Sequence, residues 1–320
     1  MYTFLGGFNA VCWTDFFQGL LMLAALMIAP IIAVITMQGA GFIAPDVVIP
    51  DNYYNALISG SFDKTSVINI ISGLAWGLGY FGMPHIIIRF MSIKSQKDLK
   101  KSAKIGITWT LLIVFFATLI GVIGRLFLGF DESINENSLV FIQIVRKIFP
   151  GVISGILLSA VLAASMSTAD SQLLAASSAF SSDVYKPVIR KGKANDKEMM
   201  WTGRIVVLGI SVAALIIASN PNAGSIMALV SNAWGIFGAA FGPAISLFWK
   251  RFNFKGAVAG IITGAAVDIL WYAFLTSTGI YELLPGFVLG LIAAVVVTLC
   301  TNEPSKEVYE LFDKAQKFDE

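Results

Sequence analysis

Long apolar stretches, with little regular alternation of polar and apolar residues, dominate this chain. A bilayer core about 30 Å thick is crossed by about 20 apolar residues in helical conformation. Stretches of this kind occur at roughly 9–37, 66–91, 104–129, 150–177, 201–219, 225–249, 255–277 and 282–301. Neither strand-like alternation nor a strand–helix–strand rhythm separates them. The pattern predicts an all-α integral membrane protein with about eight transmembrane helices.

The composition agrees with a membrane protein and narrows the classes of function. The 320 residues are 57% hydrophobic and only 13% charged, whereas soluble domains carry about 25% charged residues. The formal net charge of +2 gives no sign of a nucleic-acid partner. Cys12 and Cys300 lie far apart, and His85 is the single histidine, so neither a disulfide framework nor a multi-histidine metal site is expected. Common catalytic motifs of soluble enzymes are absent, so we expect neither an enzyme nor a bound cofactor.

The charges in the connections predict the orientation in the membrane. Lys and Arg recur in every second connection, at 92–104, 181–200, 250–255 and in the tail after 301. The connections between them carry few cations or none, at 38–65, 220–224 and 278–281, or mix both signs, at 130–149. Basic loops face the cytoplasm. We therefore expect a multi-pass protein of the cell membrane, with a transmembrane domain over 1–303 and a cytoplasmic tail over 304–320.

The ends and connections of the spans support further expectations. The opening MYTFLGGFNAVCWTD has no positive region before a short apolar core, so it is not a signal peptide. It resembles the tail of one hydrophobic segment running into the next, and we expect the chain to begin inside a longer protein. Residues 38–64 are expected to form a long external loop and 131–149 a short amphipathic helix on the outer face. Small residues at helical spacing predict close helix packing; they are Gly238, Gly242, Gly256, Gly260 and Gly264.

The stretch LAASMSTADSQ, residues 162–172, places polar groups inside an apolar run. At about 100° per residue, Ala164, Ser167, Thr168 and Ser171 share one helix face. Two hydroxyls, with a backbone carbonyl released by a local distortion, would form a small cage of hard oxygens suited to Na⁺. Alternatively, the hydroxyls bond to the carbonyl one turn earlier, as is frequent in membrane helices. The residues by themselves leave both interpretations open.

Two carboxylates accompany this face. Asp170 lies off it, and an acid inside the membrane is a functional candidate, with a structural ion pair as the alternative. Asp15, at the start of the first long span, could draw a cation along the protein. It could equally cap a helix or face solvent.

The stretch GLAWGLGYFGMPHIIIRF, residues 73–90, predicts a discontinuous span. Residues that weaken a helix crowd it; they are Gly73, Gly77, Gly79, Gly82 and Pro84. Broken helices near the midplane are where secondary transporters bind their substrates. Trp76, Tyr80 and Pro84 follow one another at intervals of four and could form an aromatic wall beside the break. Alternatively, this is a close-packing helix whose aromatic residues face lipid, and His85 is a neutral, hydrogen-bonded neighbour of the kink.

Two long motifs carry a resemblance to a known family. GLAWGLGYFGMPHIIIRFMSIKS and ILLSAVLAASMSTADSQLLAASSAFSSDVYK resemble the sodium:solute symporter family, and within it most closely the sodium/proline symporters. The likeness includes YTFLGGFNAVCWTD, SNAWGIFGAAFGPAISLFWKR and YELLPGF, and extends to about residue 303. It implies part of a LeuT-type bundle of two inverted five-helix repeats with additional helices. By that comparison the first broken helix of the bundle would be missing from this chain.

The resemblance also implies roles for individual residues in sodium binding. Ser167 and Thr168 match the paired hydroxyl ligands of the family, and Ala164 matches its backbone-carbonyl ligand. Asp15 matches an acid on the cytoplasmic exit path of the cation.

A solute site is implied in the same way. Trp76, Tyr80 and Pro84 match positions that line the proline site in proline carriers. The segment Gly82-Met83-Pro84-His85 departs from the Gly-Gln-Pro-His that proline carriers often have, which leaves the solute preference open.

The resemblance therefore implies a sodium-coupled symporter in the lipid bilayer that imports a small solute, with L-proline favoured and Na⁺ as the coupling ion. A symporter for a sugar, pantothenate or another carboxylate is the alternative within the transporter class. A membrane sensor or channel subunit of the same fold, without coupled flux, is the alternative from another class.

Overall fold

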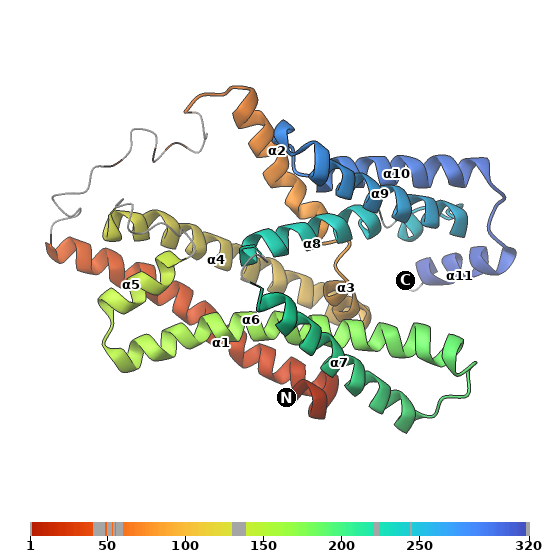
Figure 1. Cartoon of the computed structure of the whole chain (residues 1–320), viewed down its shortest axis with the longest axis horizontal. Coiled ribbons are helices and arrows are strands. Elements are labelled where there is room, and N and C mark those ends of the chain that lie inside the picture. Colours follow the sequence, from red (N-terminus) through yellow and green to blue (C-terminus); the bar gives the residue numbers. More distant parts are fainter. Residues whose placement is uncertain are drawn as a thin grey trace. The chain divides into compact units, whose positions relative to one another are not determined.

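The computed structural model describes residues 2–40, 49, 53, 55, 60–129, 139–220, 224–243 and 245–317. These residues form helices and turns, and none of them lies in a β-strand, so the predicted all-α class is confirmed for the described part of the chain. They group into two compact units (Figure 1). Unit 1 comprises Met1–Tyr53 and Lys97–Ala214, and unit 2 comprises Tyr54–Gln96 and Leu215–Glu320. Each unit is described by itself below.

The helices follow the predicted spans closely. In chain order they are α1 (Tyr2–Ala40), α2 (Lys64–Gly79), α3 (Pro84–Met91), α4 (Gln96–Leu128), α5 (Val140–Ile148), α6 (Gly151–Ala179), the π-helix η2 (Phe180–Ile189), α7 (Asp196–Ala218), α8 (Ile226–Phe241), the 3₁₀ turn η3 (Ile245–Leu247), α9 (Phe254–Phe274), the 3₁₀ turn η4 (Thr276–Thr278), α10 (Leu283–Cys300) and α11 (Lys306–Lys317). Among the described helices, six are long and apolar enough to cross a membrane, and the number is seven when the bent pair α2 and α3 is counted as one span.

The remaining predicted span, 225–249, differs from the structure in its length. It contains α8, an apolar helix that ends at Phe241, and the turn η3 follows. Gly242 and Pro243 come directly after α8. Because proline has no backbone N–H and its ring clashes with the preceding turn, a continuous helix through 249 is disfavoured.

Helix α4 begins at Gln96, well before the predicted start at residue 104. Much of the lysine-rich connection 92–104 is therefore helical. Lysine is a good helix former, and its long side chain keeps the ammonium group in water while its stem lies along the helix. The lysine-rich stretch therefore shows where the apolar part of α4 begins, but the helix itself begins earlier, at Gln96.

Unit 1 is built around small residues of α1. Ala25, Ala29 and Ala33 are buried in one cluster with residues of α4, α5 and α6. The predicted amphipathic helix is confirmed as α5, and its Ile144 and Val145 are fully buried in this cluster. The helix thus turns its apolar side into the protein. Residues 130–138 and most of the predicted external loop 38–64 lie outside the described residues.

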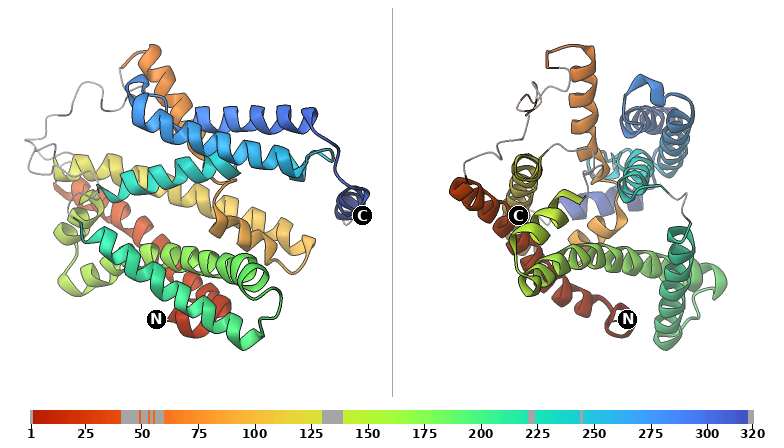
Figure 2. Two further views of the ribbon diagram at one scale, coloured as in Figure 1. Left: turned by 45° about the vertical axis from the view of Figure 1, so that its right-hand side comes forward. Right: turned by 60° about the vertical axis from the view of Figure 1, so that its left-hand side comes forward.

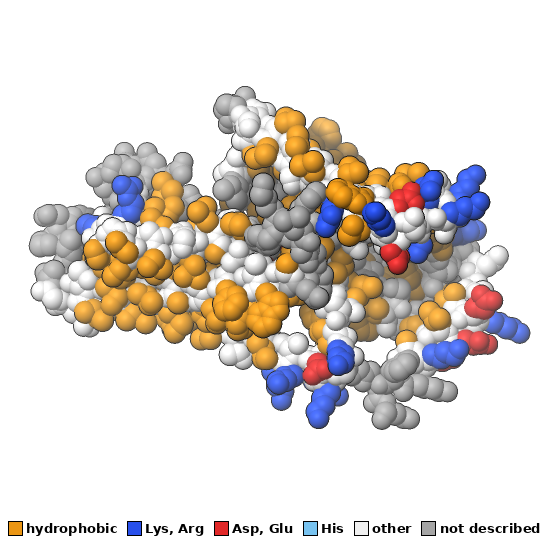
Figure 3. Space-filling model, turned by 90° about the horizontal axis from the view of Figure 1, so that it is seen from below, with side chains coloured by type: hydrophobic (Ala, Val, Ile, Leu, Met, Phe, Trp, Pro, Cys, Tyr) orange, Lys and Arg blue, Asp and Glu red, His pale blue; other side chains and the backbone are white. Residues whose placement is uncertain are grey.

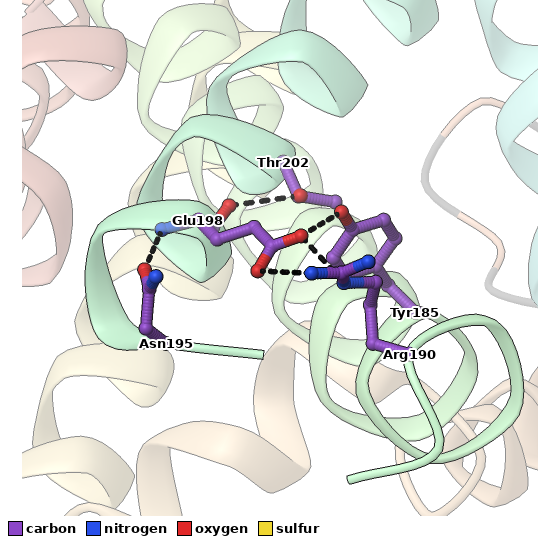
Figure 4. Close-up of polar contacts among 5 residues, drawn as sticks. All are labelled: Tyr185, Arg190, Asn195, Glu198 and Thr202. Atoms are coloured by element: carbon purple, nitrogen blue, oxygen red, sulfur yellow. Dashed lines mark hydrogen bonds and ion pairs between the residues drawn. The ribbon is translucent and has the colours of Figure 1, made fainter. Parts of the chain in front are cut away.

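In the basic segment 181–200, the carboxylate of Glu198 at the start of α7 binds side chains at the end of η2 (Figure 4). The hydroxyl of Tyr185 donates to Glu198 Oε1 at 2.7 Å, and Arg190 Nε lies 2.7 Å from the same oxygen. Asn195 Oδ1 accepts a hydrogen bond from the backbone N–H of Glu198 at 2.8 Å, an N-cap interaction at the start of α7. Glu198 therefore joins the end of the π-helix to the next membrane helix.

In unit 2, α9 and α10 run side by side (Figures 1 and 2). Two of the predicted packing glycines, Gly256 and Gly260, lie at their contact. The Cβ position on Gly260 is 2.9 Å from the Ala294 Cβ and 3.2 Å from the Gly290 carbonyl. Gly256 lies against Thr298, and Gly264 lies against the backbone of Ala239 in α8. The small-residue spacing thus predicted a true close contact between helices.

We expect that Gly264→Ala destabilises the protein by about 1–3 kcal/mol, because its methyl group would collide with the Ala239 carbonyl, which cannot move without shifting α8. Gly73→Ala in α2 is the matched control, since nothing lies within 4 Å of its Cβ position. That change should be neutral or stabilising by up to about 1 kcal/mol. Thermal unfolding of the two variants in detergent measures the difference, and equal midpoints would contradict the packing described here.

The surface of the described helices is strongly apolar. In α7, for example, no residue of the apolar stretch is buried. Figure 3 shows hydrophobic side chains gathered over much of the face that it draws, with Lys and Arg in separate groups. Soluble monomers rarely expose contiguous apolar patches of more than a few hundred Å². Such helices are typical of a protein surrounded by lipid.

Candidate functional site

The first candidate region lies on α6 in unit 1 and carries Ala164, Ser167 and Thr168. Helix α6 is continuous from Gly151 to Ala179, so the local distortion expected to release a carbonyl is not present in it. The Thr168 hydroxyl donates to the Ala164 carbonyl at 3.3 Å. This contact is the back-bonding that was the alternative interpretation of the sequence, and it keeps the two proposed oxygens next to each other.

Ser167 and Ser171 extend this face toward α1. Ser167 is half-buried, and its hydroxyl makes no hydrogen bond within the described part of the chain. Ser171 is buried; its hydroxyl lies 2.9 Å from the Ser167 carbonyl and 3.4 Å from Asp15 Oδ2 on α1. The structure therefore brings Asp15 to the hydroxyl face of α6.

Asp15 lies well inside α1, which begins at Tyr2, so it does not cap that helix. Asp170, the other acid in the polar stretch, is buried on α6. Carboxylate and hydroxyl oxygens are hard ligands of the kind that alkali and alkaline-earth cations prefer. Between two apolar helices, Asp15, Ser167 and Ser171 form a line of oxygens along which a cation can be bound.

The second candidate region is the broken helix of unit 2. Helix α2 ends at Gly79, α3 begins at Pro84, and the two are bent by 46°. The predicted discontinuity of this span is therefore confirmed. A Cβ on Gly82 would collide with the carbonyl of Phe237 in α8. Glycine thus lets the break lie directly against α8, and Pro84 supplies the first residue of the next helix, where its missing N–H does no harm.

Aromatic rings surround the C-terminal end of α2. The rings of Trp76 and Trp234 stack at 5.6 Å, and Trp76 stacks on Tyr281 at 5.7 Å. Tyr80 meets Trp234 edge-on at 4.8 Å. The indole N–H of Trp234 donates to the Trp76 carbonyl at 2.9 Å, and the Tyr281 hydroxyl donates to the Ser231 carbonyl at 2.7 Å. We call Trp76, Tyr80, Trp234 and Tyr281 the aromatic cluster.

The three predicted solute-site residues do not all lie in the aromatic cluster. Trp76 and Tyr80 belong to the aromatic cluster, and half of the Tyr80 side chain remains exposed. Pro84 is exposed at the start of α3 and makes no ring contact with this cluster in the described structure. His85 follows it and is half-buried.

Sequence reasoning missed two members of the aromatic cluster, Trp234 and Tyr281. Each lies in a segment that was noted for its family likeness, but no periodicity connects it with α2, which is more than 150 residues away in the chain. It also missed Asp268, an acid in the middle of the predicted span 255–277. That signal was available, because a carboxylate inside an apolar span is a functional candidate by itself.

The hydroxyl face of α6 belongs to unit 1 and the aromatic cluster to unit 2. Comparison with known proteins shows which family contains both segments. The model of the sodium:solute symporter family matches residues 1–264. The osmoregulated proline transporter OpuE of Bacillus subtilis (strain 168) is 45% identical over 99% of this chain. The high-affinity proline transporter PutP of the same organism is 43% identical over 98%. The chain spans 64% and 66% of the lengths of these two relatives.

Sodium/proline symporter 2 of Staphylococcus saprophyticus is 41% identical over 99% of this chain, which spans 63% of that relative. Among solved structures, the substrate-bound, outward-open state of a Na⁺-coupled sialic acid symporter matches with a TM-score of 0.73. That match covers 95% of this chain and 65% of the other at 21% sequence identity, and it shows a shared LeuT-like fold. The chain is a multi-pass membrane protein that belongs to the sodium:solute symporter family.

Proposed function

We propose that this chain forms part of a sodium-coupled symporter that imports L-proline across the cell membrane. The relatives that it resembles over nearly its whole length are described as proline transporters and sodium/proline symporters. The proposed activity is transport and not catalysis, and Na⁺ is the coupling ion, with no other cofactor.

The observation that carries the proposal is the polar line between α1 and α6. Oxygens of Asp15, Ser167 and Ser171 follow one another between two helices that are otherwise apolar. Carboxylate, hydroxyl and carbonyl oxygens are hard ligands, and a row of them between apolar helices suits a small hard cation such as Na⁺. We assign Ala164, Ser167 and Thr168 to Na⁺ binding and Asp15, through Ser171, to the path by which the ion leaves.

We assign the solute to the break between α2 and α3, with Trp76 and Tyr80 as its wall and Pro84 at the start of the second half. Proline joins an apolar ring to a zwitterion. The ring suits an aromatic surface such as Tyr80, whose side chain remains half exposed. The interrupted helix offers the opposite partial charges of its two ends to the ammonium and carboxylate groups.

In this mechanism the fall of Na⁺ through its electrochemical gradient drives uptake. The electrical part alone is worth about 2.3 kcal/mol per charge for each 100 mV. Thermodynamic coupling is reciprocal, so solute must tighten the binding of Na⁺ by the same factor as Na⁺ tightens that of solute.

We place the C-terminus, with α11 and the tail 304–320, in the cytoplasm. Lys and Arg concentrate in the segments on that side by the alternation of loop charge. A reporter enzyme that is active only in the cytoplasm, fused after Glu320, should be active; an inactive but expressed fusion would reverse the orientation.

Uptake of labelled proline tests the function. The complete gene is expressed in cells that lack their own proline carriers, and uptake is measured with and without an inward Na⁺ gradient. We expect accumulation that depends on Na⁺ and collapses when a sodium ionophore removes the gradient. Sugars, pantothenate and other carboxylates are added as competitors; competition by one of them, without transport of proline, would assign a different solute. Binding of proline without accumulation would indicate a sensor.

A further inference from the structure

Two buried carboxylates meet in unit 2 and are not used by the proposed transport mechanism. Asp268 lies in α9 and is 4% exposed; Glu282 directly precedes α10 and is 8% exposed. The Cβ position on Gly235 of α8 is 3.0 Å from Asp268 Oδ2 and 3.4 Å from Glu282 Oε1. The two side chains are therefore neighbours, and they lie against α8 at a glycine, Gly235, which leaves room for both.

Within the described residues, neither acid forms an ion pair with a positive charge. Asp268 Oδ2 is fully buried and has no hydrogen-bond partner in the same part of the chain. The hydroxyl of the adjacent Tyr281 donates to the Ser231 carbonyl and not to either acid. The buried pair thus lacks a compensating cation among the described residues.

The helices packed around the pair contribute few other titratable groups. Helix α8 has none, α9 has Lys255 in its first turn and Tyr272 besides Asp268, α10 has Cys300 at its far end, and α2 has Lys64 at its first position. None of the lysines is near enough to form an ion pair with Asp268 or Glu282 in the described structure.

Two adjacent carboxylates in a medium of low dielectric constant cannot both remain ionised. They can accept a cation or share a proton. A cation such as Ca²⁺ takes six or more oxygens, whereas the described residues bring no third His, Cys, Asp or Glu side chain to this pair. We propose that Asp268 and Glu282 form a proton-binding site, in which one shared proton joins α9 to the start of α10 beside Gly235 of α8.

The burial of Glu282 also favours the protonated form, since it raises the pKa of that carboxyl above its ordinary value. A carboxyl whose pKa is higher in the folded than in the unfolded protein binds more protons when folded. Stability is therefore greatest below the ordinary pKa of the acids and declines as pH rises toward the raised value. Beyond that value the pair is fully ionised and the helices repel one another through it.

The experiment uses the purified full chain in lipid nanodiscs, with the midpoint of thermal unfolding measured from about pH 5 to about pH 9. We expect the midpoint of the unaltered protein to fall across this range. In Asp268→Asn/Glu282→Gln both groups are neutral at every pH, so the slope should flatten. Asp313→Asn is the matched control, because Asp313 is half exposed and paired with Lys250; it should retain the slope.

Infrared difference spectroscopy identifies the proton directly. The unaltered protein should show the carbonyl stretch of a protonated carboxylic acid at neutral pH, and ¹³C-labelled aspartate or glutamate should shift it. This measurement needs no variant, so it decides the matter even if the double variant does not fold. Absence of that band, or an unchanged slope in the double variant, would overturn the proposal. So would stabilisation by Na⁺ or Ca²⁺ at high pH that the double variant lacks, since it would make the pair a metal site. None of these measurements depends on transport of proline.

Discussion

Ser167→Ala/Thr168→Ala, introduced together into the complete transporter, is expected to raise the Na⁺ concentration for half-maximal proline uptake by about 100-fold or more. A hydrogen-bonding group that acts on a charge contributes about 1.5–3 kcal/mol, so loss of two contributes about 3 kcal/mol, and every 1.4 kcal/mol is a factor of ten. Initial rates of uptake over a range of Na⁺ concentrations measure the change. Helix α6 should remain intact, because both side chains are at least partly exposed and alanine favours a helix.

Ser165→Ala is the matched control for this effect. Ser165 lies on the same helix, is exposed, and donates to the Val161 carbonyl at 3.0 Å. Its loss should leave the Na⁺ dependence within about twofold, as expected for an exposed hydroxyl. If the double variant behaves like this control, or if uptake is insensitive to Na⁺ in both, the assignment of the sodium site is wrong.

Trp234→Ala is expected to give the largest loss of stability, about 3–5 kcal/mol, as for other large aromatic residues removed from a core. Trp234 is buried, stacks on Trp76, supports Tyr80 edge-on and donates to the Trp76 carbonyl. Without it, the end of α2 loses its support next to the break. Thermal unfolding measures the loss, and binding of labelled proline should weaken even at temperatures where the variant is folded.

Two further variants separate the contributions of this residue. Trp234→Phe retains an aromatic ring but removes the hydrogen bond to Trp76, and should cost only about 1 kcal/mol. Phe248 belongs to the same unit and is 84% exposed, so Phe248→Ala should change stability little. A loss from Phe248→Ala as large as that from Trp234→Ala would show that the aromatic cluster has no special role.

Some features of the candidate site depend on residues close together in the sequence, and others depend on contacts between residues far apart in it. The shared face of Ser167, Thr168 and Ser171 follows from helical periodicity alone, and so does the break at Gly82 and Pro84, because both depend on residues a few positions apart. That Asp15 approaches Ser171 is different, since 156 residues separate them. Likewise, the span 66–91 predicts Trp76 and Tyr80 on one helix face, but nothing local predicts that both contact Trp234.

The amino-acid sequence by itself determined the membrane location, the order and approximate bounds of the spans, and the positions where small residues allow helices to pack closely. These properties depend on the hydrophobicity of each segment and on the helix preferences of its own residues. In lipid each segment must satisfy its own backbone hydrogen bonds, so neighbouring segments are not needed to define it. Only the tertiary structure decided that α5 turns its apolar side inward, that Trp234 supports the broken helix, and that Asp268 and Glu282 share one buried space. Such contacts depend on which helix faces meet, and many pairings of apolar helices are nearly equal in hydrophobicity, so packing between particular side chains makes the choice.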